Sequence, residues 1–213
     1  MDLGWLKYLI PGTSEKEDKE LALLKQRKAE LDTRRRGAYK PVFSPTPDER
    51  AILDGLHPVV RPRVLETLQD ATFRGLFVVL FCGIRTFDES DKLYKRGRNS
   101  KGDIVDIKKV VTNAKPGYSW HNYAAAVDIV MNIGPRDHLH LTWDDFVDAT
   151  KDMVNDWVTL GDIGKSHGLS WGGNFKTLID VPHFQYHYGF ELVTDALTLY
   201  NTSSMDAVWA RIK

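Results

Sequence analysis

The chain has 213 residues, enough for one domain with an appended segment or for two small domains. Its 29 lysines and arginines balance 29 aspartates and glutamates, and the sequence pI is about 7.1. This balance gives no general reason to bind nucleic acid or an anionic lipid surface. Cys82 is the only cysteine, which excludes a disulfide within the chain, and its apolar neighbours predict a buried, inert thiol.

No apolar stretch of the sequence approaches the length of a membrane span. The stretch from Leu3 to Ile10 is too short for a secretory signal and lacks a basic leader. We therefore expect synthesis in the cytoplasm without a signal peptide, and a monomer.

Residues 1–45 differ in character from the rest of the chain. Ser14 and Glu17 have the spacing of a capping box, and the charged stretch that follows carries leucines in a narrow stripe. We expect a helical extension over residues 1–45 and a main domain over residues 46–213. The extension is either a solvated helix docked on the domain or a separate attachment or membrane-perturbing element with a sticky apolar end.

The main domain should open with two helices. Thr46 precedes Pro47 at the first helical position, and acidic residues follow in the first turn. A second helix is expected from about Arg61 to Arg74, with Gly75 as its stop.

Residues 76–82 are too short and too apolar for anything but a central strand. This strand delivers Arg85 to the loop at its end, where the side chain can reach a site or form a surface salt bridge. A short helix over residues 88–96 should follow, and residues 99–117 predict a loop that borders a cleft.

Apolar residues at helical spacing also predict helices in the C-terminal part of the chain. Thr142 should cap a helix whose core residues are Phe146, Met153, Val154, Trp157 and Leu160. Gly161 should break that helix, and residues 163–167 should add a turn or two. Residues 192–212 predict one or two closing helices, the second capped by a serine.

The stretch from Ser119 to Asp128 places an imidazole and a carboxylate on either side of a turn. Residues 124–131 are small or β-branched and apolar apart from Asp128, which predicts a buried strand with one carboxylate. Such a carboxylate is costly unless a cation, a set of donors or a metal compensates for its lost hydration. His121 lies just before the strand. One further ligand would complete a catalytic zinc site, which leaves its fourth position to water.

His183, within Asp180-Val181-Pro182-His183, offers that third ligand. The pattern Ser-x-His-x6-Asp followed by Asp-x-Pro-His resembles the zinc peptidases that cut bacterial cell-wall peptides, the D-alanyl-D-alanine carboxypeptidases and L-alanyl-D-glutamate endopeptidases. Further matching segments lie at residues 83–87, 93–98, 112–115 and 168–175, so the resemblance covers roughly residues 46–190. Trp171-Gly172-Gly173 is most similar to the L-alanyl-D-glutamate branch, which includes phage endolysins and a few bacterial autolysins.

The resemblance implies a role for each matching residue. His121, Asp128 and His183 would hold one zinc ion per chain. Asp180 would be the general base, although it could instead cap a turn and orient His183. Arg85 would stabilise the carbonyl oxygen or anchor a substrate carboxylate. The expected substrate contacts are Ser119 and Trp171, and a core position suits Trp171 almost as well.

Two details qualify the match. The family usually has glycine where this chain has Ala124, and a left-handed backbone there would strain alanine by about 1 kcal/mol. We expect an ordinary backbone at that position. His138 and His140 form a rival metal pair, but their neighbours are polar and no buried carboxylate is near in sequence.

The predicted fold is α+β, with a small, mainly antiparallel sheet that holds the metal site between flanking helices. The resemblance implies the fold shared by D,D-peptidases and the Hedgehog signalling domain. It also implies zinc-dependent cleavage of the peptidoglycan stem peptide at the L-Ala–D-Glu bond by an endolysin-type lytic enzyme, which reaches the cell wall after release or with a virion. The alternatives are a D-alanyl-D-alanine carboxypeptidase and a non-catalytic wall-binding or virion assembly protein.

Overall fold

The computed structural model describes residues 42–134, 138–144, 146–176 and 179–213, together with Lys19, Ala22, Lys25 and Gln26. The chain divides into two compact units, Met1–Pro41 and Val42–Lys213. In the first unit the four described residues are helical and exposed. The predicted capping box at Ser14 and the leucine stripe lie outside the described residues. The domain boundary at residue 45 stays a prediction.

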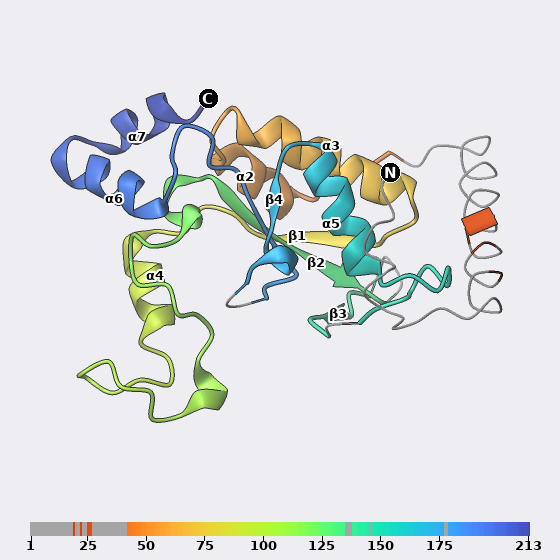
Figure 1. Ribbon diagram of the computed structural model, residues 1–213, viewed down its shortest axis with the longest axis horizontal. Coiled ribbons are helices and arrows are strands. Elements are labelled where there is room, and N and C mark those ends of the chain that lie inside the picture. The colour runs from red at the N-terminus through yellow and green to blue at the C-terminus, as the bar shows by residue number, and fades with distance from the viewer. Residues whose placement is uncertain are drawn as a thin grey trace. The chain divides into compact units, whose positions relative to one another are not determined.

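The second unit alternates helices with short strands (Figure 1). Its helices are α2 (Pro47–Gly55), α3 (Val60–Phe73), α4 (Phe87–Tyr94), α5 (Asp156–Ser166), α6 (Val193–Thr202) and α7 (Met205–Arg211), with single turns η2 (Ile107–Lys109), η3 (Trp120–Tyr123) and η4 (Gly172–Asn174). Its strands are β1 (Val78–Cys82), β2 (Ala126–Asn132), β3 (Leu141–Thr142), β4 (Ser170–Trp171) and β5 (His183–Gln185). No helix in the described part of the chain has the length and apolar character needed to span a membrane.

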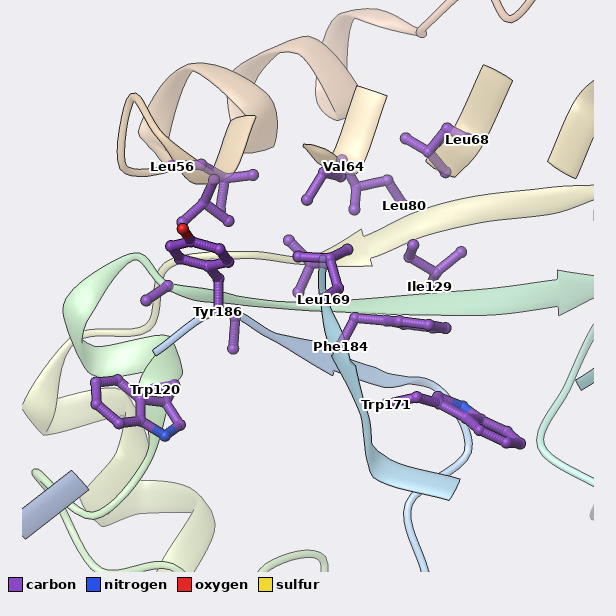
Figure 2. Close-up of a cluster of buried hydrophobic side chains, with 14 of the residues drawn as sticks. Leu56, Val64, Leu68, Leu80, Trp120, Ile129, Leu169, Trp171, Phe184 and Tyr186 are labelled. Carbon is purple, nitrogen blue, oxygen red and sulfur yellow. The ribbon is translucent and has the colours of Figure 1, made fainter. Parts of the chain in front are cut away.

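The strands form one antiparallel sheet in the order β1-β2-β5-β4, and β3 pairs with the end of β2. Helix α3 contributes Val64 and Leu68 to the core, and Leu56, the C-cap of α2, joins them. Figure 2 shows these side chains above Leu80 and Ile129 of the sheet. Helices flanking a small antiparallel sheet confirm the predicted α+β class.

The start of α2 shows how local sequence and tertiary packing agree. The Thr46 hydroxyl accepts the Glu49 N–H at 3.2 Å, and a Glu49 carboxylate oxygen accepts the Thr46 N–H at 2.9 Å. This capping box confirms the predicted helix start. The other Glu49 oxygen accepts the Leu80 N–H at 3.1 Å, so the cap also ties α2 to β1.

The prediction that residues 76–82 form a central strand is wrong, because β1 pairs only with β2 among the described strands and lies at the sheet edge. Leu80 faces the core, whereas Phe81 is 51% exposed and packs edge-on against Trp143. The apolar run therefore reflects core-facing side chains at Leu76 and Leu80 and an exposed Phe81 that pairs with Trp143. It does not reflect burial on two faces.

The helix predicted to start at Thr142 begins 14 residues later, at Asp156 with Asn155 as its N-cap. Thr142 lies in β3, and the expected core residues Phe146 and Met153 are 66% and 60% exposed. The apolar spacing was misleading because aspartate side chains in the intervening segment bond to its backbone N–H groups and hold a loop.

Gly161 does not break α5 but lies inside it. A Cβ atom at this position would lie 2.4 Å from the Trp171 ring, so glycine permits close packing between helix and tryptophan. This packing buries Trp171.

Candidate metal centre

Asp128 and His183 are cross-strand partners, because β2 and β5 pair with these two residues in register. Side chains of directly opposite residues lie on the same face of a sheet, so the carboxylate and the imidazole meet. His121 approaches from η3, the turn just before β2. The sheet thus brings together two histidines that are 62 positions apart in the sequence.

The three side chains converge through one atom each. His121 Nε2 lies 3.2 Å from Asp128 Oδ1 and 3.2 Å from His183 Nδ1. The third distance, between His183 Nδ1 and Asp128 Oδ1, is 3.4 Å. Both histidines are buried, and the Asp128 side chain is 20% exposed.

The outer nitrogen of each ring faces an acceptor. His121 Nδ1 lies 2.6 Å from the Gly83 carbonyl oxygen, and His183 Nε2 lies 2.9 Å from Gln185 Oε1. An oxygen acceptor requires a proton on the ring nitrogen that faces it, so in a neutral imidazole the inner nitrogen carries the lone pair. Two imidazole lone pairs and one carboxylate oxygen therefore point at one another.

This arrangement fits a tetrahedral metal ion. Zinc bonds to nitrogen and carboxylate oxygen of about 2.0–2.1 Å place two ligand atoms of a tetrahedron about 3.3–3.4 Å apart. The three measured separations, 3.2, 3.2 and 3.4 Å, match that edge length. Two imidazoles with one carboxylate are also a known donor set of catalytic zinc sites. His121, Asp128 and His183 could thus hold such an ion.

Electrostatics leads to the same requirement for positive charge. Burial opposes protonation of His121, but the adjacent Asp128 carboxylate overcomes this effect and raises the pKa of His121 to about 10. Burial likewise opposes ionisation of Asp128, yet its histidine neighbours lower the pKa of Asp128 well below its usual value. The cluster is therefore stabilised by a cation, which is either a proton or a metal ion.

The turn that aims His121 contradicts one expectation. Ala124 follows η3 with φ 57° and ψ 27°, in the left-handed region, where we expected an ordinary backbone. Its N–H bonds to the His121 carbonyl, and its side chain is fully buried. The chain needs this conformation to pass from η3 into β2. Alanine is therefore strained by about 1 kcal/mol at a position that suits glycine.

Arg85 and Cys82 border the cluster at the end of β1. Arg85 Nη2 lies 3.5 Å from Asp128 Oδ2 and 3.4 Å from the Cys82 sulfur. The prediction of a buried, inert thiol at Cys82 is wrong, because the residue is half-buried and lines the same cavity as the cluster. Burial raises the pKa of the Cys82 thiol, but the His121 and Arg85 side chains lower it by a larger amount. The net effect is a lowered pKa.

Asp180 lines the same cavity from the loop before β5. Among the described residues its carboxylate has no hydrogen-bond partner, and burial raises the pKa of Asp180. Glycine is needed nearby, because a Cβ atom on Gly172 would lie 2.3 Å from the Asp180 carbonyl oxygen. Gly172 thus lets the two segments that support β5 approach each other.

The cluster opens into a cavity of about 1230 Å³. Its lining includes the Phe81–Trp143 pair and residues of α4. Ser119 lines this cavity as the sequence predicted, whereas Trp171 does not. Trp171 is 7% exposed and donates its indole N–H to the Val181 carbonyl at 2.8 Å, in agreement with the alternative of a core tryptophan.

The other histidines of the described chain lie elsewhere. His138 and His140 are exposed and do not line the cavity. His187 stacks on Trp120 with a centroid distance of 5.8 Å, and His167 pairs with acidic side chains of α3.

Sequence reasoning missed three groups that support the cluster. These are the Gly83 carbonyl, the Gln185 amide and the Cys82 thiol. Side chains two positions apart in a strand share a face, so the contact of Gln185 with His183 could have been inferred from the sequence. Nothing in the sequence pattern pointed to the other two.

Comparisons with known proteins find similar peptidases. Residues 112–186 match a family model described as D-alanyl-D-alanine carboxypeptidase. The peptidoglycan L-alanyl-D-glutamate endopeptidase CwlK of Bacillus subtilis (strain 168) is 35% identical over 130 residues, which cover 61% of this chain and 72% of CwlK. The crystal structure of the Serratia marcescens L-Ala D-Glu endopeptidase ChiX aligns with a TM-score of 0.42 and 20% identity, over 68% of this chain and 90% of ChiX.

The chain therefore belongs to the metallopeptidase family that contains the D-alanyl-D-alanine carboxypeptidases and the L-alanyl-D-glutamate endopeptidases. The matched residues 112–186 include His121, Asp128, Asp180 and His183, and Arg85 lies outside them.

Proposed function

We propose that this protein is a zinc-dependent peptidase that cleaves the stem peptide of peptidoglycan between L-Ala and D-Glu. The observation that carries the proposal is the triangle of acceptor atoms from His121, Asp128 and His183, with sides of 3.2, 3.2 and 3.4 Å. The similarity to CwlK supports the choice of bond.

When bound, zinc would lower the pKa of a water ligand and polarise the scissile carbonyl group. The residues of this chain would supply the proton transfers and the positioning. Gly83 and Gln185 would keep the two imidazoles in the tautomers that leave their inner nitrogens free.

Asp180 is the proposed general base. Its carboxylate lines the cavity without a hydrogen-bond partner among the described residues, so it is free to accept a proton from the attacking water. It would then return that proton to the amine of D-Glu as the peptide bond breaks. Burial raises the pKa of Asp180, which makes both transfers easier near neutral pH.

Arg85 is proposed to face the carbonyl oxygen of L-Ala or a carboxylate of the substrate. Its guanidinium is held 3.5 Å from Asp128 Oδ2 and 3.4 Å from the Cys82 sulfur, so it is positioned before substrate arrives. A prepositioned cation stabilises negative charge on the carbonyl oxygen as water adds. Ser119, which also lines the cavity, is a proposed substrate contact.

An endopeptidase fits the cavity better than the alternative, a D-alanyl-D-alanine carboxypeptidase. Endopeptidases must bind substrate on both sides of the cleaved bond. A cavity of about 1230 Å³ beside the cluster provides room for such a substrate.

Cleavage at this bond would separate stem peptides from glycan strands and so remove cross-links from the cell wall. We therefore propose a lytic role of the endolysin type, acting from outside the cytoplasm or from a virion. Clearing of turbid suspensions of permeabilised bacteria by the purified protein would test that role.

The decisive experiment is digestion of purified peptidoglycan followed by mass spectrometry of the soluble products. The proposal expects peptides with D-Glu at their N-terminus, and none from the Asp128→Asn variant. Release of free D-Ala alone would identify a carboxypeptidase. Binding to the wall without any soluble product would identify a non-catalytic wall-binding protein.

A further inference from the structure

The cavity has a cationic face. Among the described residues, three arginines and lysines line the cavity: Arg85, Lys92 and Arg96. We call these three side chains the cationic face. Glu89 lines the cavity with them, and the spacing of 89, 92 and 96 places their side chains along one side of α4 and the turn that follows it.

The acidic residue of this helix side is already engaged. A Glu89 carboxylate oxygen accepts the Thr86 N–H at 2.8 Å and the Thr86 hydroxyl at 2.9 Å in a capping box. In the described chain, no carboxylate lies within 4.0 Å of the charged groups of Lys92 or Arg96. Both cations therefore face the cavity without an ion-pair partner.

Lys95, at the C-terminal end of the same helix, differs from Lys92 and Arg96. Its ammonium forms an ion pair with Asp91, and it does not line the cavity. A cation with a local partner stabilises the helix, whereas Lys92 and Arg96 are available to an anionic ligand.

The face extends away from the metal cluster. Arg85 contacts Asp128 at the cluster, and Arg96 lies seven residues beyond Glu89, with its N–H bonded to the Leu93 carbonyl. Seven residues of helix span about 10 Å, the length of about three residues of extended peptide. Phe81 and Trp143, which also line the cavity, form an uncharged aromatic pair.

The substrate has matching chemistry on one side of the cleaved bond. A D-Glu residue within a peptide uses one carboxyl group for the next amide and keeps the other as a free carboxylate. In some stem peptides this second group is a carboxamide, which is uncharged. L-Ala, on the other side of the bond, has no such group.

Resting on the function proposed above, we propose that Lys92 and Arg96 bind the carboxylates on the D-Glu side of the cleaved bond. The cationic face thereby makes the peptidase selective for stem peptides whose D-Glu carboxylate is free, and orients D-Glu toward α4.

The test uses two synthetic muramyl tripeptides that differ only at D-Glu, with a free carboxylate in one and a carboxamide in the other. The wild-type enzyme should cleave the first with a kcat/KM about tenfold higher or more, mainly through a lower KM. In the Lys92→Met/Arg96→Gln double variant this ratio should fall toward one. Both side chains are exposed, so the substitutions leave the core intact.

Lys95→Met is the matched control, because it removes one positive charge from the same helix end outside the cavity. It should keep the wild-type ratio. Equal cleavage of both peptides by the wild type, or an unchanged ratio in the double variant, would overturn the cationic face while leaving the proposed function in place. Absence of cleavage at the L-Ala–D-Glu bond in both peptides would overturn the function and this inference together.

Discussion

Two groups of side chains that could ligate a metal occur in the described chain, Cys82–His121–Asp128, which His183 adjoins, and Asp148–Asp152–Asp156. Their acceptor atoms face different partners. At the first, His121, Asp128 and His183 direct acceptors at one another. At the second, the carboxylates of Asp148, Asp152 and Asp156 lie within 4.8 Å of one another, before and at the start of α5.

The carboxylates of the second cluster are occupied by the loop that carries them. Asp156 accepts the N–H groups of Ala149 and Thr150 and the Thr150 hydroxyl. Asp148 accepts two further N–H groups, and Asp152 accepts one. These bonds stabilise a loop in which Lys151 and Met153 have positive φ.

Proximity of ligand atoms is therefore a weak criterion for a metal site. Acceptors that already receive N–H donors have little need of a cation, whereas acceptors that face only other acceptors require one. We therefore expect zinc at the first cluster, and a structural role for the second. Substitutions in the two clusters and in their neighbours should separate zinc binding from loop stabilisation.

Asp128→Asn should remove zinc and activity. Loss of a ligand carboxylate should cost more than the roughly 10- to 100-fold in metal affinity typical for loss of a supporting partner. Elemental analysis should show about one zinc per wild-type chain and much less in the variant, with partial rescue by excess zinc. Asp148→Asn, the matched control in the second cluster, should keep both zinc and activity.

Zinc affinity should also weaken as pH falls, because protons compete for His121, whose pKa Asp128 raises to about 10 in the absence of metal. Zinc titrations between pH 5 and 8 measure this slope. If the Asp148→Asn variant lost zinc and the Asp128→Asn variant retained it, the assignment of the two clusters would be reversed.

Asp180→Asn should lower turnover by about 10²- to 10⁴-fold while zinc occupancy stays near that of the wild type. In the wild type, kcat/KM should fall on acidification as Asp180 becomes protonated. Because burial raises the pKa of Asp180, this fall should begin at a higher pH than for an ordinary carboxylate. The residual activity of the variant should lack this acid limb. Equal zinc loss in Asp180→Asn and Asp128→Asn would make Asp180 a ligand.

Asp156→Ala should destabilise the fold by about 1–3 kcal/mol, because two N–H groups and a hydroxyl lose their buried acceptor. Zinc content should not change. Denaturant unfolding measures the loss. Asp152→Ala, which removes an acceptor from the Val154 N–H alone, should have a smaller effect. If Asp156→Ala alters zinc content instead, the second cluster takes part in metal binding.

Ala124→Gly should stabilise the protein by about 0.5–1 kcal/mol, because glycine adopts φ 57° without steric strain. The adjacent Ala125 is equally buried and is not among the described residues with positive φ. Ala125→Gly should therefore destabilise by a similar amount. Thermal unfolding of both variants decides the point, and a loss of stability in both would argue against a strained turn at His121.

A chain that starts at Val42 should fold and cleave soluble muropeptides at the wild-type rate. One that starts at Thr46 should be less stable, because the Phe43 ring packs against the core and its N–H bonds to Gln69 Oε1 at 2.9 Å. Melting temperatures and hydrolysis rates separate the two. An inactive or insoluble Val42 chain would show that residues 1–41 belong to the catalytic unit.

Sequence alone was sufficient where the cause of a structure lies in neighbouring residues. The capping box at Thr46, the stop at Gly75 and the serine cap of α7 at Ser204 depend on atoms within a few positions of one another. The resemblance of the sequence to the cell-wall zinc peptidases also implied His121, Asp128 and His183 as one set. Their role as ligands stays a prediction.

Tertiary structure decided what depends on residues distant in the chain. Pairing of β2 with β5 sets Asp128 opposite His183, and pairing of β1 with β2 sets Cys82 opposite Asp128 and brings Arg85 to the cluster. Apolar spacing failed at α5, because side-chain bonds from Asp148 and Asp156 favour a loop over an earlier helix start. The left-handed Ala124 was missed for a related reason. The backbone strain at Ala124 is outweighed by the burial and hydrogen bonding of the whole turn. The conformational preference of a single residue does not include these contributions.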